Sequence, residues 1–280
     1  MIGHNRDKPE RIWVRGIVSE SAAEQPIEGK AQIDLVSVRL AFGDRRVFDG
    51  LSCRFPQGRI SVILGASGVG KSTVLRLASG LLKPDYGDIW IGDQEVSRMP
   101  EEPLHRVRRG LGMMFQGGAL LDSLTVFDNV ALALREHTRL SEREIEEKVH
   151  AQFEAVGLKK VDSLLPGEIS GGMKKRVALA RAMIMEPSIL LIDEPFSGLD
   201  PLAVRLIEHL LVEVNRTKGL TMVLTNHHIG STIRMADEIV FLVDGVSVTG
   251  SVKEIRESID PRIARFLEAA GTGPTLEEAS

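Results

Sequence analysis

A glycine-rich segment between an apolar run and a helical pattern constrains this chain more than any other feature. Residues 65–73 read Gly-Ala-Ser-Gly-Val-Gly-Lys-Ser-Thr, which fits the spacing G-x-x-x-x-G-K-[ST] of a phosphate-binding loop. The apolar residues 60–64 predict a buried strand before it, and residues 71–82 predict a helix after it, with Gly80 close to its end. Strand, loop and helix in this order predict a nucleotide site in an α/β fold.

The residue types in this loop suit phosphate chemistry. Glycines let the backbone wrap closely, so that successive N–H groups and a helix N-terminus face the phosphates. The lysine neutralises the β- and γ-phosphates, and the serine hydroxyl after it is a ligand for Mg²⁺. A purely structural glycine turn explains neither the lysine nor the flanking strand and helix. The residues predicted to bind nucleotide here are Gly65, Ser67, Gly68, Gly70, Lys71, Ser72 and Thr73.

An apolar run that ends in two acids supplies the second element of the site. Residues 190–194 read Leu-Leu-Ile-Asp-Glu, a buried strand with carboxylates at its end. We expect Asp193 to reach Mg²⁺ through water, and Glu194 to orient or deprotonate the attacking water. A solvated turn is the alternative for such a pair alone. The phosphate loop in the same chain favours the catalytic interpretation.

Strand and helix patterns alternate on both sides of a helical middle. We predict a P-loop NTPase (RecA-like) α/β core with a mostly parallel sheet and an inserted α-helical subdomain. In the helical part, Ser141 and Glu144 form a capping-box pattern that opens a helix ending near Gly157. The predicted units are a flexible N-terminal tail (1–30), the core (31–102 and 186–262), the helical subdomain (103–185), and a short C-terminal helix and tail (263–280).

Composition excludes several classes of protein. Lys and Arg total 35 against 39 for Asp and Glu, a net charge of −4, and aromatic residues are 4%, so neither a basic surface nor a stacking platform for nucleic acid is expected. The one cysteine, Cys53, excludes an intramolecular disulfide and a multi-cysteine zinc site. We expect a reduced, cytoplasmic setting. No apolar run has the length of a membrane-spanning helix, and the charged N-terminus does not fit a signal peptide.

A serine and two glycines open a further predicted helix about twenty residues before the acidic pair. Ser170 suits an N-cap, and Gly171 and Gly172 bare the first backbone N–H groups; taken alone, this is merely a capped helix. The full order is phosphate loop, Gln116, S-G-G-M, L-L-I-D-E, S-G-L-D and a late histidine. Over residues 31–266 this order resembles the nucleotide-binding subunit of an ABC transporter.

The resemblance implies that two copies of the chain hold two ATP molecules and Mg²⁺ between them. Ser170, Gly171 and Gly172 would then grip the γ-phosphate bound to the partner copy. The remaining residues carried over from the family are Asp200 at the dimer seam, Gln116 between Mg²⁺, the attacking water and a membrane partner, His227 at the γ-phosphate, and Phe42 stacked on adenine.

Two departures from the family pattern concern the S-G-G-M segment at residues 170–173, which is the signature and opens the signature helix, and the late histidine. Met173 stands where most members have Gln, and Asn226-His227-His228 stands where Ser-His-Asp is commoner. His228 leaves two candidate imidazoles, of which the register selects His227. Phe42 also has two interpretations, because a core phenylalanine fits its position nearly as well as an adenine contact.

Other segments resemble a narrower group, the ATPases of Mla-type transporters that work with MCE-domain lipid-binding proteins. Residues 115–120, 126–130 and 134–138 carry this resemblance. It implies phospholipid transport between inner and outer membranes from the cytoplasmic face of the inner membrane, with a permease docked near Gln116–Asn129. The apolar residues of that segment also fit an ordinary helical core. Ser197-Gly198-Leu199-Asp200 and the short C-terminus differ from common Mla-type members.

Other functions stay open at this point. The same core would serve an importer of an amino acid or other solute, or the release of lipoproteins. A soluble ABC ATPase of DNA repair or translation is a different class. The sequence has no long heptad arms, no second ATPase copy and no basic surface, and these three absences disfavour that class. A regulatory ATP sensor without hydrolysis is disfavoured by Glu194.

Overall fold

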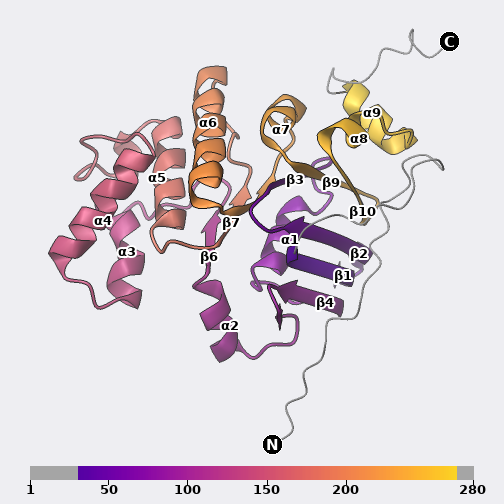
Figure 1. The fold of residues 1–280 in the computed structure, drawn as a ribbon, viewed down its shortest axis with the longest axis horizontal. Coiled ribbons are helices and arrows are strands. Elements are labelled where there is room, and N and C mark those ends of the chain that lie inside the picture. Colours follow the sequence, from indigo (N-terminus) through magenta and orange to yellow (C-terminus); the bar gives the residue numbers. More distant parts are fainter. Residues whose placement is uncertain (1–30, 270–280) are drawn as a thin grey trace, which may run out of the picture.

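Two β-sheets and a lobe of helices build the part of the chain that the computed structural model describes, residues 31–269 (Figure 1). The predicted tail, 1–30, and residues 270–280 lie outside that range. The larger sheet has the strand order β10-β9-β3-β8-β7-β6, and the smaller sheet β2-β1-β4-β5. The strands are β1 (Ala31–Phe42), β2 (Arg45–Pro56), β3 (Ile60–Leu64), β4 (Tyr86–Ile91), β5 (Gln94–Glu95), β6 (Leu111–Met114), β7 (Ile189–Asp193), β8 (Thr221–Thr225), β9 (Glu238–Val243) and β10 (Val246–Gly250).

The larger sheet confirms the predicted fold class. All neighbours from β9 to β6 pair in parallel, and only β10 joins antiparallel, on β9. Every residue of β3, β7 and β8 is buried, as expected for strands covered on both faces. Side chains alternate between two apolar clusters: Val62 and Leu64 face one, and Ile63 faces the other. The carboxyl ends of these strands therefore meet along one edge.

The smaller sheet was not predicted as a separate element. In it β1 pairs antiparallel with β2 and with β4. Helix α1 (Lys71–Ala78) packs between the two sheets, with Val74, Leu75 and Leu77 in the cluster that joins them. Cys53 is buried in the same cluster, and burial raises the pKa of its thiol far above the ordinary value. The phosphate-loop helix is thus held from both sides.

Three helices form a lobe at one end of the molecule: α3 (Val126–His137), α4 (Glu142–Ala155) and α5 (Gly171–Met183) (Figure 1). The predicted capping box at Ser141 and Glu144 is confirmed, and Ser170 caps α5 as predicted. The predicted helical range, 103–185, also contains a strand. β6 pairs in parallel with β7, so this range adds an edge strand to the core sheet.

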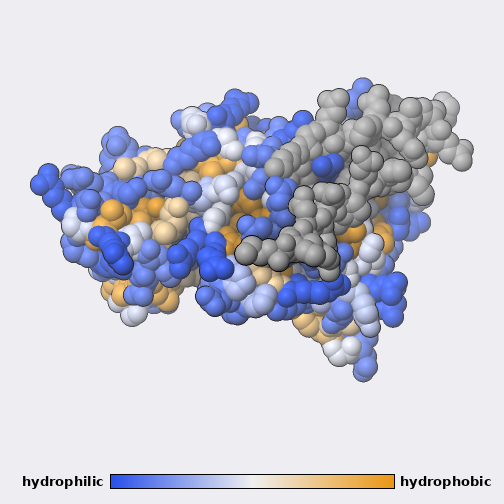
Figure 2. Space-filling view, turned by 60° about the horizontal axis from the view of Figure 1, so that its bottom comes forward, coloured by the Kyte–Doolittle hydropathy of each residue, from blue (hydrophilic) through white to orange (hydrophobic). Residues whose placement is uncertain are grey.

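The remaining helices surround the sheets. They are α2 (Glu101–Arg108), the 3₁₀ turn Pro166–Glu168, α6 (Pro201–Lys218), α7 (Ile229–Met235), α8 (Val252–Arg256) and α9 (Pro261–Ala269). The face in Figure 2 is mostly hydrophilic with smaller apolar areas, including some over the helical lobe at its left. Within residues 31–269, no helix has both the length and the apolar character that crossing a bilayer requires.

Candidate active site

The glycine-rich loop leaves β3 at Gly65 and enters α1 at Lys71, as predicted. Gly65 has a φ of +149°, and a Cβ atom there would lie 2.6 Å from the carbonyl oxygen of Leu242. Glycine therefore allows β3 to pair with β9 up to the point where the loop turns. Among the described residues, no side chain caps the first turn of α1. Its backbone N–H groups are available to an anion.

Lys71 folds back over this loop. Its side chain is only 6% exposed, and its Nζ donates to the carbonyl oxygens of Gly65 and Ala66, both at 3.0 Å. Burial lowers the pKa of Lys71, while the nearby carboxylates of Glu194 and Asp193 oppose that shift. A phosphate oxygen is a stronger acceptor than a carbonyl oxygen because it is charged. The lysine is therefore placed to exchange its carbonyl partners for a nucleotide phosphate.

Asp193 ends β7 beside the loop and receives two hydroxyl hydrogen bonds. Ser72 Oγ donates to Asp193 Oδ1 at 2.9 Å, and Thr225 Oγ1 donates to the same oxygen at 2.6 Å. The serine hydroxyl and carboxylate side by side fit Mg²⁺, which prefers oxygen ligands and completes its shell with phosphate and water. Within the described residues, no cluster of three His, Cys, Asp or Glu side chains offers a metal site of another kind.

Glu194 follows directly and carries the second carboxylate. Gln116 Nε2 donates to Glu194 Oε2 at 2.9 Å, and His227 Nδ1 lies 3.6 Å from Glu194 Oε1. The backbone of Glu194 is left-handed, with φ +44°, and its N–H donates to Thr225 Oγ1 at 2.9 Å. A left-handed glutamate is strained by about 1–2 kcal/mol, so the surrounding bonds hold it in place.

The two adjacent histidines have different places. His227 lines the pocket, whereas His228 is the N-cap residue of α7. The backbone N–H groups of both donate to Asn226 Oδ1, and their ring centroids are 4.3 Å apart. Burial, and then the neighbouring His227, lower the pKa of His228. The histidine selected by register is therefore the one that faces Glu194.

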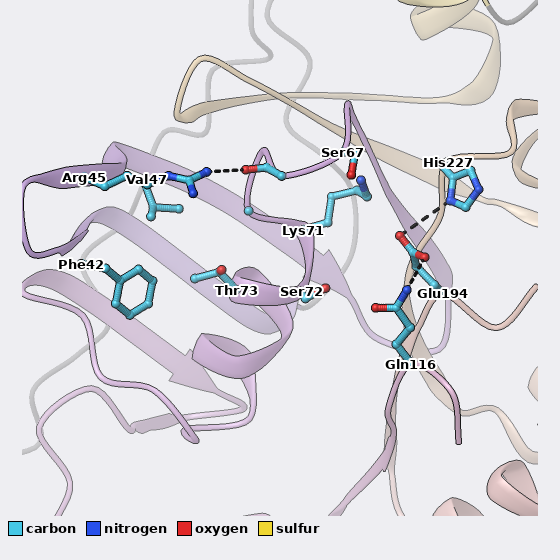
Figure 3. Close-up of a pocket in the computed structure, with 12 residues that line it drawn as sticks. Phe42, Arg45, Val47, Ser67, Lys71, Ser72, Thr73, Gln116, Glu194 and His227 are labelled. Atoms are coloured by element: carbon cyan, nitrogen blue, oxygen red, sulfur yellow. Dashed lines mark hydrogen bonds and ion pairs between the residues drawn. The ribbon is translucent and has the colours of Figure 1, made fainter. Parts of the chain in front are cut away.

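These groups share a pocket of about 630 Å³ (Figure 3). Phe42 and Val47 lie at one end, Lys71 is central, and Gln116, Glu194 and His227 lie at the other end. Phe42 is 51% exposed, which excludes the alternative of a core phenylalanine. The other residues that line the pocket are Arg45, Ser67, Gly68, Gly70, Ser72 and Thr73. Gly65 and Asp193 lie just behind this wall, where they contact Lys71 and Ser72.

The other predicted residues are not in this pocket. Ser170 accepts a hydrogen bond from the Met173 N–H at 3.2 Å and caps α5, and Asp200 caps α6 through the N–H groups of its first turn. A Cβ atom on Gly171 would lie 4.0 Å from Leu199, and one on Gly172 would lie 3.6 Å from the Ala203 Cβ. Ser170, Gly171 and Asp200 are exposed. One chain alone thus does not bring its signature helix to its own phosphate loop.

Three residues of the site were missed in the sequence. Thr225 ends β8, the strand between β3 and β7, and bonds both acidic residues. Arg45 donates to the Gly68 carbonyl oxygen at 3.2 Å, and Val47, two residues further along β2, lies beside it in the wall (Figure 3). The apolar run of residues 221–225 indicates a buried strand that ends in a hydroxyl, but not which groups that hydroxyl bonds. Arg45 and Val47 belong to no motif that separates them from an ordinary strand.

The comparisons agree with this geometry. The ABC transporter family model matches residues 48–197. The Intermembrane phospholipid transport system ATP-binding protein MlaF of Escherichia coli K12 is 40% identical over 243 residues, which cover 86% of this chain and 90% of that protein. The "Probable ribonucleotide transport ATP-binding protein mkl" of Mycobacterium tuberculosis H37Rv is 36% identical, covering 86% of this chain and 68% of that protein.

A solved structure supports the same assignment. It is the dimeric ATP-binding cassette MJ0796 in a post-hydrolysis state bound to ADP and Pi. It superimposes with a TM-score of 0.73 at 28% identity, covering 79% of this chain and 98% of that one. The geometry of the pocket agrees with these similarities. We conclude that the chain belongs to the ABC transporter family and is an ATP-binding subunit that hydrolyses ATP with Mg²⁺.

Proposed function

We propose that two copies of this chain sandwich two ATP molecules and drive a permease that moves phospholipid between the inner and outer membranes, together with an MCE-domain partner. The observation that carries the proposal is the incomplete site: Lys71, Ser72 and Glu194 share one pocket, while the exposed Ser170 at the start of α5 does not line it. A second copy supplies a surface that one chain lacks. The cassette MJ0796 is itself dimeric in the solved structures.

The roles within one pocket follow from the contacts. Lys71 binds the β- and γ-phosphates, and Phe42 and Val47 contact the adenine end of the nucleotide. Ser72 and, through water, Asp193 and Gln116 would hold Mg²⁺, which neutralises charge that develops on the phosphates. Glu194 accepts the proton of the attacking water, and His227 stabilises the γ-phosphate. Hydrolysis adds charge and releases a phosphate, which reopens the dimer.

The second copy completes the site through its α5. Ser170, Gly171 and Gly172 would direct a helix N-terminus at the partner's γ-phosphate, with Asp200 at the seam between copies. Gly171 and Gly172 lie close to the segment around Asp200, because a Cβ atom on each would be within 4.0 Å of Leu199 or Ala203. That closeness supports this arrangement. Binding of ATP then closes the two copies on each other.

The permease docks beside Gln116–Asn129 in this proposal. A groove of about 540 Å³ lies there, between α2, β6 and the ends of α3 and α5. Phe115, next to Gln116, lines it and is 38% exposed. Gly117 and Gly118 have φ values of +79° and +88°, so the segment turns sharply directly after Gln116. A permease segment in this groove would move Gln116 and, through it, the carboxylate of Glu194.

The remaining assignments concern the domains and the membrane. We propose that residues 31–102 and 186–262 form the nucleotide-binding core and that the helical subdomain, 103–185, carries the signature and the permease contact. The subunit would sit peripherally on the cytoplasmic face of the inner membrane through that contact. The phospholipid substrate is taken from MlaF, which aligns at higher identity and over more of its length than mkl does.

The test is capture of the intact complex. Tagged Glu194→Gln protein is purified from native membranes with Mg-ATP, with Lys71→Ala as the matched control that cannot hold nucleotide. We expect Glu194→Gln to bind ATP without turnover, and mass spectrometry to find a permease, an MCE-domain protein and phospholipid. A solute-binding receptor, a ribonucleotide or no membrane partner contradicts the lipid assignment. Normal turnover of Glu194→Gln contradicts Glu194 as the base.

A further inference from the structure

A buried lysine on the signature helix contacts the backbone of Glu194. Lys175 lies on α5 and is 5% exposed. Its Nζ donates to the Glu194 carbonyl oxygen at 3.1 Å and to Ser197 Oγ at 3.1 Å. Within residues 31–269, no carboxylate forms a salt bridge with Lys175. Its bonds therefore go to the short segment that connects β7 with α6.

Burial of this ammonium group needs a reason. Burial lowers the pKa of Lys175, and the charges of Glu194 and Asp193 oppose that shift. A buried cation without a carboxylate partner costs free energy that a methionine of similar length avoids. The bonds to Glu194 and Ser197 are the compensation that the structure offers.

Glu194 is the residue that gains from such a bond. Its backbone is left-handed and its N–H is held by Thr225 Oγ1, so one end of the residue is fixed from β8. Its carbonyl oxygen accepts from Lys175 Nζ and from Ser197 Oγ, the latter also at 3.1 Å. Lys175 is the partner among these that comes from outside the loop. Without Lys175, the Glu194 carbonyl oxygen keeps the bond from Ser197, which belongs to the same short turn.

We propose that Lys175 is a positioning residue for ATP hydrolysis: it fixes the main chain of Glu194 so that the carboxylate stays between Gln116 and His227. The proposal rests on the proposed role of Glu194 as the base. It further implies that α5 carries two functions five residues apart, since Ser170 opens the helix and Lys175 lies about 7.5 Å further along its axis. A shift of α5 on ATP binding would be transmitted to Glu194 directly.

The test uses the full-length chain and two replacements. Lys175→Met keeps the length and removes the donor, and Lys175→Gln keeps a neutral donor. Lys148→Met is the matched control, because Lys148 is a surface lysine of α4 paired with Glu186. For each we would measure kcat and KM for ATP, the Kd for Mg-ATP, and thermal unfolding. Glu194→Gln is measured in parallel.

We expect Lys175→Met to lower kcat by about ten- to a hundredfold, the loss typical of a displaced catalytic group, with KM and Kd within about twofold. Lys175→Gln should recover part of that loss, and Lys148→Met should equal the parent chain. A kcat of Lys175→Met within twofold of the parent overturns the proposal. So does a loss of kcat matched by an equal loss of Mg-ATP binding and by unfolding, since that is a structural effect.

The parallel variant separates this proposal from the one on which it rests. An inactive Glu194→Gln with a fully active Lys175→Met removes only the role of Lys175. An active Glu194→Gln removes the base itself, and the role of Lys175 falls with it. Loss of kcat in both, with partial recovery in Lys175→Gln, supports the two assignments together.

Discussion

At the scale of single residues, the site depends on groups that meet from distant parts of the chain. The loop residues and the adjacent Asp193 and Glu194 were predictable because each set is contiguous and has a chemical meaning in itself. Thr225 and Lys175 were not predictable, because their roles depend on bonds to Glu194, from which they are 31 and 19 residues away in the sequence. A hydroxyl or a lysine in an apolar stretch is common, and only the fold shows what it bonds.

Removal of the Thr225 hydroxyl should affect stability and metal dependence together. Thr225→Val keeps the shape but leaves the Glu194 N–H and Asp193 Oδ1 without this partner. The free energy of unfolding should fall by about 1–3 kcal/mol, the cost of unsatisfied buried groups. The Mg²⁺ concentration for half-maximal ATPase activity should rise. Urea titration and Mg²⁺ titration measure the two effects; Thr225→Ser, which keeps the hydroxyl, should show little of either.

Phe42 gives a prediction about nucleotide binding without chemistry. It is half-exposed at the end of the pocket opposite Glu194 (Figure 3). Loss of its ring in Phe42→Ala should raise KM for ATP by about three- to tenfold, from about 1 kcal/mol of aromatic contact, and leave kcat unchanged. Phe42→Tyr, which retains the ring, is the control. A changed kcat in Phe42→Ala with normal KM would rule out the adenine contact.

At the scale of helices and strands, local sequence patterns predicted where helices begin, but they did not predict which strands pair. The capping box at Ser141 and the N-cap at Ser170 each involve residues within four positions of sequence, and the structure has both. β6 was missed because four residues between a helix and a glycine loop carry too little period to separate strand from helix. The smaller sheet joins β1 with β4 across more than forty residues, and no local pattern specifies such a partner.

Asp200 allows the capping role and the seam role to be separated. Its Oδ1 accepts from the N–H groups of Leu202 and Ala203, at 2.9 and 3.0 Å. Asp200→Ala should therefore lower the free energy of unfolding by about 1 kcal/mol. Asp200→Asn keeps an acceptor oxygen and should retain most of that stability. Light scattering with ATP then reports the seam: equal dimerisation of Asp200→Asn and the parent chain would show that the carboxylate charge is not needed there.

At the scale of the whole molecule, the pocket and the signature helix belong to different halves of a working site. Lys71→Ala removes the phosphate contact of one copy, and Ser170→Arg blocks the signature of the other. Each variant alone should be inactive. An equal mixture should recover about a quarter of the parent activity, because half of the dimers are mixed and each has one intact site. Steady-state ATPase assays of the mixture measure this, and an inactive mixture would argue for sites contained in single chains.

The burial of Cys53 has a practical consequence. It is the one cysteine in the sequence, and its thiol lies in the core with its pKa raised by that burial. Maleimides react with the thiolate form of accessible cysteines, so the parent chain should resist labelling while folded. A single cysteine placed on the surface, for example at Leu202, would then carry a spectroscopic label without further changes to the chain. Distances between such labels would follow the approach of two copies as ATP is added and consumed.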